Sequence, residues 1–119
     1  MTKKSLLVIE DDETIRTILA QHLRSEGFVV DEATDGKHAF SLLETIKLPD
    51  LILTDVNMPH IDGEEFIYMK NANPIFKKIP VMVISSSDRV KHLATHTVAT
   101  FTKPFDVDEV IRSIHRVLD

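Results

Sequence analysis

Five short apolar or β-branched runs divide this chain at regular intervals. Three of them are continuously apolar: Leu6–Ile9, Leu51–Leu53 and Val81–Ile84. Such runs are too short for a globular helix, and continuous rather than alternating apolar character indicates burial on both faces, as in the central strands of a parallel sheet. We therefore predict strands at Ser5–Ile9, Phe28–Val30 (extending toward Ala33), Leu51–Thr54, Val81–Ser85 and Ala99–Thr102.

Segments with helical periodicity lie between these strands. In the first segment the apolar residues share one helix face: Ile15, Ile18, Leu19 and Leu23. Asp12 is predicted to cap the start of this helix, and Gly27 to adopt the left-handed conformation after its end. Further helices are predicted around Ala39–Ile46 (ending by Pro49), from Gly63 through Phe66 and Met69 to near Pro74, from about Asp88 to Ala94, and over Val110–Leu118.

The order of elements is therefore strand then helix, five times. Parallel strands need crossover connections, and right-handed crossovers place helices on both faces of the sheet. We predict a doubly wound, five-stranded parallel α/β sheet of the (βα)5 flavodoxin-like type. The length of 119 residues suits a single domain over residues 1–119.

Composition excludes several classes of function. With 14 Lys and Arg against 19 Asp and Glu, the net charge is −5, which disfavours direct nucleic-acid binding. The absence of cysteine excludes disulfides, thiolate metal sites and thiol catalysis. No apolar run is long enough for a signal peptide or a membrane span, so we expect a cytoplasmic chain with no membrane partner. The glycines lie singly, so neither a dinucleotide-binding fingerprint nor a P-loop is present.

Chemically active side chains stand at the ends of four predicted strands. Glu10 and Asp11 follow the first strand, Asp55 follows the third, Ser85 ends the fourth and Lys103 follows the fifth. Because the carboxyl ends of parallel strands meet at one edge, where α/β sheets place their sites, we expect these side chains to converge.

Three close carboxylates repel one another unless a cation neutralises them. Oxygen ligands without cysteine or a well-placed histidine suit Mg²⁺. Lys103 would add a second positive charge, and a metal and a lysine beside a carboxylate suit a phosphoryl group. Asp55 is then the expected nucleophile, forming an acyl phosphate.

Taken singly, each of these residues has an ordinary structural explanation. Acids such as Glu10 and Asp11 are common at helix N-termini, and a lysine before a proline is common in turns. Their predicted meeting at one edge favours the functional interpretation. The pair His92 and His96 has helical spacing suited to a metal, but without a third ligand two exposed helix histidines are the preferred interpretation.

Four motifs resemble those of a known family. Together they are similar, in order and over essentially the whole chain, to the receiver domain of two-component response regulators: Leu7–Asp12, Leu53–Pro59 with Asp62 and Gly63, Val83–Ser86, and Thr102–Phe105.

The resemblance implies a role for each site residue. Asp55 resembles the phosphoacceptor, Ser85 the switch hydroxyl, and Lys103 the lysine that contacts the phosphoryl group; the peptide bond from Lys103 to Pro104 is commonly cis in this family. Asn57 and Ser87 resemble the residues that tune autodephosphorylation in this family. The implied Mg²⁺ ligands are Glu10, Asp11, Asp55 and the backbone carbonyl of Asn57.

The implied function is that of a signalling switch in a phosphorelay rather than an enzyme. A histidine kinase or histidine phosphotransfer protein would donate the phosphoryl group, and a downstream protein partner would read the change, unless an effector segment lies outside this sequence. The chain would be a monomer or a phosphorylation-dependent dimer.

Two alternatives remain open from the sequence. The first is a pseudo-receiver that binds proteins without phosphate: the interval from Ser85 to Lys103 is about one helical turn shorter than usual, and Thr100 stands at the aromatic switch position. The second is a Mg²⁺-dependent phosphohydrolase acting through an aspartyl phosphate, although Asn57 stands where that class needs a second acid.

Overall fold

The computed structural model describes residues 3–56, 58, 60, 62–85 and 97–119. Its elements follow in the order β1 (Ser5–Ile9), α1 (Glu13–Ser25), β2 (Val29–Ala33), α2 (Gly36–Leu43), β3 (Leu51–Asp55), α3 (Gly63–Asn71), the 3₁₀ turn η1 (Phe76–Lys78), β4 (Val81–Ser85), β5 (Ala99–Thr102) and α4 (Val107–Leu118).

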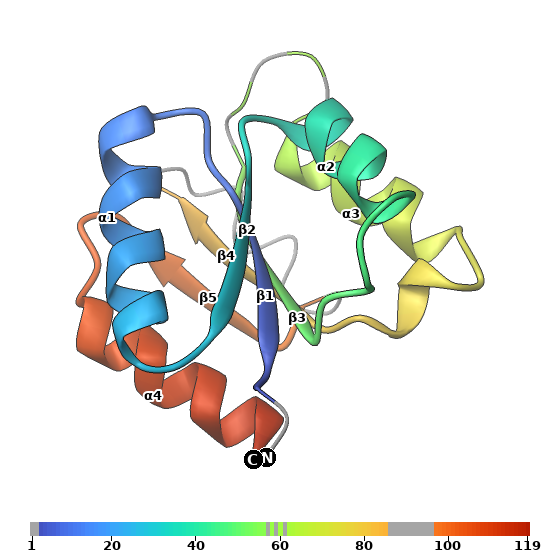
Figure 1. Ribbon diagram of the computed structural model, residues 1–119. Coiled ribbons are helices and arrows are strands. Elements are labelled where there is room, and N and C mark those ends of the chain that lie inside the picture. The colour runs from blue at the N-terminus through green and yellow to red at the C-terminus, as the bar shows by residue number, and fades with distance from the viewer. Residues whose placement is uncertain (1–2, 57, 59, 61, 86–96) are drawn as a thin grey trace.

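The strands form one parallel sheet in the order β2-β1-β3-β4-β5. Helices α1 and α4 cover one face of this sheet, and α2 and α3 cover the other (Figure 1). The predicted doubly wound, five-stranded fold is confirmed. Among the described residues, no helix has the length and apolar character that a membrane crossing requires.

The continuous apolar runs are explained by two cores, one on each face of the sheet. Leu7, Ile9 and Ile52 pack with Phe66 of α3 on one face. The neighbouring strand residues point to the other face, where they pack with Leu23 of α1 and Ile114 of α4. These strand residues are Leu6, Val8, Leu51 and Leu53. Alternate side chains of one strand thus enter different cores, so every position is apolar.

Aspartate side chains cap the four described α-helices. The predicted cap is confirmed, because the Asp12 carboxylate accepts a hydrogen bond of 2.9 Å from the backbone N–H of Ile15. The equivalent residues of α2, α3 and α4 are Asp35, Asp62 and Asp106. Gly27 has φ 97°, the left-handed conformation predicted for it after α1.

Several predicted boundaries were wrong. Strand β2 starts at Val29 rather than Phe28, and β3 includes Asp55 as its last residue. Helix α2 ends at Leu43, short of Ile46. In α3, Met69, one of the apolar residues that predicted this helix, is exposed. The helix predicted from about Asp88 lies outside the described residues.

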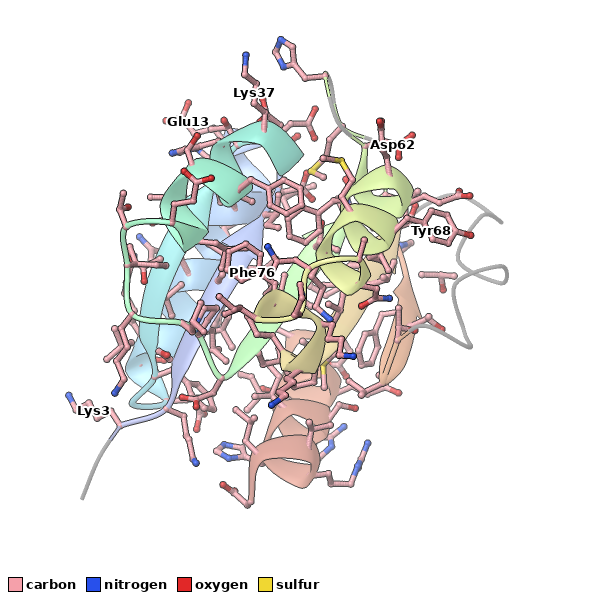
Figure 2. The ribbon with its side chains drawn as sticks, turned by 90° about the vertical axis from the view of Figure 1, so that its right-hand side faces the viewer. Lys3, Glu13, Lys37, Asp62, Tyr68 and Phe76 are labelled. Atoms are coloured by element: carbon pink, nitrogen blue, oxygen red, sulfur yellow. The ribbon has the colours of Figure 1, made fainter. Side chains whose placement is uncertain are left out.

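The starts of three helices lie at one end of the molecule. In Figure 2, Glu13, Lys37 and Asp62, which stand at or next to the starts of α1, α2 and α3, lie at the upper end, and Lys3 lies at the lower end. Each of these helices follows a strand, so this end is the carboxyl edge of the sheet. The candidate site residues belong to this edge.

Candidate functional site

Strand register brings the predicted site residues to one edge of the sheet. Ile9 pairs with Thr54, Asp55 pairs with Ile84, and Ser85 pairs with Thr102. The residues next to these pairs therefore lie side by side. The backbone N–H of Lys103 continues the ladder by donating to the Ser85 carbonyl at 3.0 Å.

Three carboxylates gather at this edge. One oxygen from each of Glu10, Asp11 and Asp55 lies within 4.8 Å of the others. Glu10 is 3% exposed and Asp55 is 6% exposed, whereas Asp11 faces solvent. The cluster thus has two buried members and one exposed member on its open side.

Lys103 binds both buried carboxylates. Its Nζ donates to Glu10 Oε1 at 2.8 Å and to Asp55 Oδ2 at 2.9 Å. The structure thus brings the Lys103 amine to the carboxylates of Glu10 and Asp55, as the strand order predicts. A buried charge that lacks a partner is costly, so this bridge keeps two carboxylates stable in a largely dry position.

Burial and the neighbouring Asp55 charge disfavour the ionised form of Glu10 despite this bridge. Burial raises the pKa of the Glu10 carboxyl, the Lys103 hydrogen bond opposes that rise, and the Asp55 charge adds to it, so the pKa reaches about 7. Burial on its own would lower the pKa of Lys103, but its hydrogen bonds and attraction to Glu10 and Asp55 raise it. The amine therefore stays charged near neutral pH, while Glu10 titrates there.

Backbone contacts fix the two buried acids in place. Asp55 Oδ1 accepts a hydrogen bond of 2.6 Å from the N–H of Val56, and Glu10 Oε2 accepts one of 3.2 Å from the N–H of Asp12. Arg16 Nη1 donates to the Glu10 carbonyl at 2.8 Å and its Nε lies 3.4 Å from a Glu32 oxygen.

Sequence reasoning missed the role of Arg16. A basic residue in the first turns of a helix opposes the helix dipole, and such a residue commonly has a specific partner. That conflict is the signal that could have identified it.

Gly63 allows the loop after β3 to fold against the site. Its N–H donates to the Val56 carbonyl at 2.8 Å. A Cβ at this position would overlap the Asp55 carbonyl oxygen and press on Val56 Cα. Both are backbone atoms, so this position requires a residue without a side chain.

The remaining predicted residues fall into two groups. Ser85 is fully buried at the end of β4, and the bond from Lys103 to Pro104 is cis. Thr100 is exposed on β5, one of the two edge strands of the sheet. The Asn57 carbonyl and Ser87 lie outside the described residues.

The acidic cluster fits a small divalent cation. Mg²⁺ binds oxygens at 2.0–2.1 Å, so two of its ligands are at most about 4.2 Å apart. The oxygens of Glu10, Asp11 and Asp55 lie within 4.8 Å of one another, close to that limit. All three donors are hard carboxylate oxygens, the type that Mg²⁺ prefers.

The chain is similar to proteins of one family in sequence and in structure. The family model described as "Response regulator receiver domain" matches residues 6–115. Response regulator Rre1 of a Synechocystis strain is 30% identical over 96% of this chain and 51% of its own length. The chain spans about half the length of this and other curated relatives.

Solved structures of response regulators have the same fold as this chain. The chemotaxis response regulator CheY4 of Vibrio cholerae matches with TM-score 0.87 and 26% identity, covering 98% of this chain and 100% of that one. The response regulator TrrA of Thermotoga maritima, in complex with Mg²⁺-BeF, matches with TM-score 0.85 and 25% identity, covering 97% and 99%.

Proposed function

The chain belongs to the response regulator receiver domain family of two-component signalling, and we propose that it is a phosphorylation switch with Asp55 as the phosphoacceptor. The observation that supports this most strongly is the Lys103 bridge, which holds one ammonium between Glu10 and Asp55 at the carboxyl edge of the sheet. No structural need for burying two acids and one amine there is evident from the fold alone.

The proposed reaction is a transfer between two side chains. An Asp55 carboxylate oxygen attacks the phosphorus of a phosphohistidine, the new O–P bond forms, and the P–N bond breaks. The electron pair of that bond stays on the imidazole nitrogen of the donor. Asp55 thus becomes an acyl phosphate, and no oxidant or further reactant is needed.

The residues around Asp55 supply the charge that this transfer requires. Lys103 already contacts Asp55 Oδ2 at 2.9 Å and is placed to bind a phosphoryl oxygen. Glu10, Asp11 and Asp55 would hold Mg²⁺, together with the Asn57 carbonyl that the family resemblance implies. When bound, the ion reduces repulsion between the carboxylates and the incoming phosphoryl oxygens. The similar TrrA structure, which contains Mg²⁺-BeF, supports this assignment.

The switch would act through the Lys103–Ser85 connection. The oxygens of a phosphoryl group on Asp55 would compete with the carboxylate oxygens of Glu10 and Asp55 for the Lys103 ammonium. They would also accept a hydrogen bond from the Ser85 hydroxyl. The backbone N–H of Lys103, the residue after β5, donates to the carbonyl of Ser85 at the end of β4. Changes at these two residues therefore shift both segments together, to the extent that the phosphoryl group binds one arrangement better than the other.

The expected donor is a histidine kinase or a histidine phosphotransfer protein, and the expected reader is a protein partner. Because the chain spans about half the length of curated relatives, output through a further domain is part of the same proposal. Reading by a partner needs only the charge and packing change described above.

Intact-mass measurement tests the proposal. The protein is incubated with acetyl phosphate, with and without Mg²⁺, and we expect the mass of one phosphoryl group to be added only with Mg²⁺. Asp55→Asn should abolish this addition and keep the circular dichroism spectrum. The matched control is Asp108→Asn, which changes an exposed aspartate in the first turn of α4.

The outcomes separate the alternatives. Absence of labelling in a folded wild-type chain would favour a pseudo-receiver, and labelling of Asp55→Asn would assign the phosphate to another residue. Repeated release of phosphate from simple esters would favour a phosphohydrolase.

A further inference from the structure

Lys70 is buried far from the carboxylate site. It is 3% exposed near the end of α3. Removing an ammonium group from water is costly unless an anion compensates it. The position of Lys70 therefore requires an explanation that the phosphorylation site does not provide.

The partners of Lys70 are neutral. Its Nζ donates to Asn71 Oδ1 at 3.0 Å and to the Lys77 carbonyl at 3.1 Å. Within the described part of the chain, no carboxylate lies within salt-bridge distance of it. An ammonium has three N–H donors, so these two bonds leave one donor and the full positive charge uncompensated. Burial lowers the pKa of Lys70, as expected for a cation with no anionic partner.

A pocket of about 420 Å³ adjoins this ammonium. Lys70 lines it together with the exposed Lys77 and Lys78, and Val98 borders it. Its lining residues run from Lys77 of η1 to Val81, the first residue of β4, so the pocket lies at the amino end of that strand. The length of β4, about 13 Å at 3.3 Å per residue, separates it from the edge that holds Asp55.

We propose that this pocket, defined by Lys70, Lys77 and Lys78, binds a small oxyanion, either a phosphate or a carboxylate group. Such a group would accept the third N–H of Lys70 and receive further attraction from the other two lysines. The concentration of three lysines is notable in a chain of net charge −5. If Lys70 served only to link α3 to η1 through the Lys77 carbonyl, the ammonium groups of Lys77 and Lys78 would not be needed at the same pocket.

The test is a titration of ¹⁵N-labelled protein, without Mg²⁺ and with a chelator, at constant pH and ionic strength. Inorganic phosphate is one ligand and acetate is the other. We expect saturable shifts of the amides of Ile79, Val81 and Val98, which border the pocket. The ligand that produces these shifts shows whether the pocket binds a phosphate or a carboxylate group. The absence of saturable shifts with both phosphate and acetate would overturn the proposal.

Three variants make the result specific. Lys70→Met should weaken binding by at least about tenfold, because a charge-assisted hydrogen bond is lost. Lys78→Gln should weaken it several-fold without disturbing the buried contacts, and it decides the matter if Lys70→Met does not fold. Lys47→Gln, which removes an exposed charge outside the pocket, should have no effect. Unchanged affinity in Lys78→Gln, or in a folded Lys70→Met, would show that the anion binds elsewhere.

Discussion

Glu10 determines how the site without metal responds to pH. Burial and the nearby Asp55 charge disfavour its ionised form, and the hydrogen bonds from Lys103 and from the Asp12 backbone N–H compensate only in part. Its pKa of about 7 in the folded protein exceeds the ordinary value of 4.5. Ionised Glu10 is therefore less favourable in the folded state than in the unfolded chain.

This shift gives a prediction for Glu10→Gln. Below about pH 4.5 the carboxyl is protonated in both states and costs nothing, and as the pH rises through about 7 the folded protein takes on the full cost of ionisation. The free energy of unfolding of the Mg²⁺-free wild type should thus fall over this interval, by a few kcal/mol at most, since one pKa unit is about 1.4 kcal/mol.

Urea denaturation at a series of pH values measures the effect. In Glu10→Gln this part of the pH dependence should be absent, while Lys103 stays protonated throughout and does not contribute to the difference. Parallel pH profiles for the wild type and the variant would contradict the assignment.

At the scale of single residues, sequence reasoning succeeded where the strand pattern decides position. Glu10, Asp55 and Lys103 each occupy the end of a strand or directly follow one, so their proximity depends only on the sheet being parallel. The burial of Lys70 could not be predicted in this way. It depends on the Lys77 carbonyl of η1, an element whose position relative to α3 has no periodic signal.

Elements were predicted well in type and less well in extent. The predicted bounds of β1, β4 and β5 are confirmed, and in β1 and β4 a continuous apolar run ends at a polar residue. Helix α2 ends before the apolar Ile46, whose N–H still bonds to the Leu42 carbonyl in a turn. A turn of this kind continues the apolar pattern after the helix has ended, so periodicity alone overestimates the helix.

The junction between β3 and α3 gives a prediction for Gly63→Ala. The added Cβ would meet backbone atoms of Asp55 and Val56, which cannot rotate away as a side chain could. We expect a loss of about 1–3 kcal/mol in the free energy of unfolding, as in other overpacked sites. Because the displaced backbone includes Asp55, labelling by acetyl phosphate should also slow.

The matched control is Met69→Ala, an exposed position of the same helix. It should leave both the stability and the labelling rate nearly unchanged. Denaturation and intact-mass kinetics on the two variants measure the effects, and equal behaviour of both would show that the close approach at Gly63 is unimportant.

For the whole molecule, the parallel sheet holds three acids together that would otherwise separate. Glu10 and Asp11 follow β1 and Asp55 ends β3, so Asp55 stays close to the other two only while β1 and β3 remain paired. In the unfolded chain Asp55 is free to move away from the other two. A cation that binds the cluster therefore binds the folded protein alone and must stabilise it.

Mg²⁺ should raise the melting temperature, and more so at about pH 8 than at about pH 5.5. Metal binding requires ionised carboxylates, and at the lower pH most Glu10 is protonated because its pKa is about 7. At a concentration about 100 times Kd, one bound ion contributes about 2.7 kcal/mol. Thermal denaturation with Mg²⁺ and with a chelator at both pH values measures the difference. Asp11→Asn, which removes the exposed ligand, should lose most of the stabilisation, and an equal rise in that variant would place the metal outside the cluster.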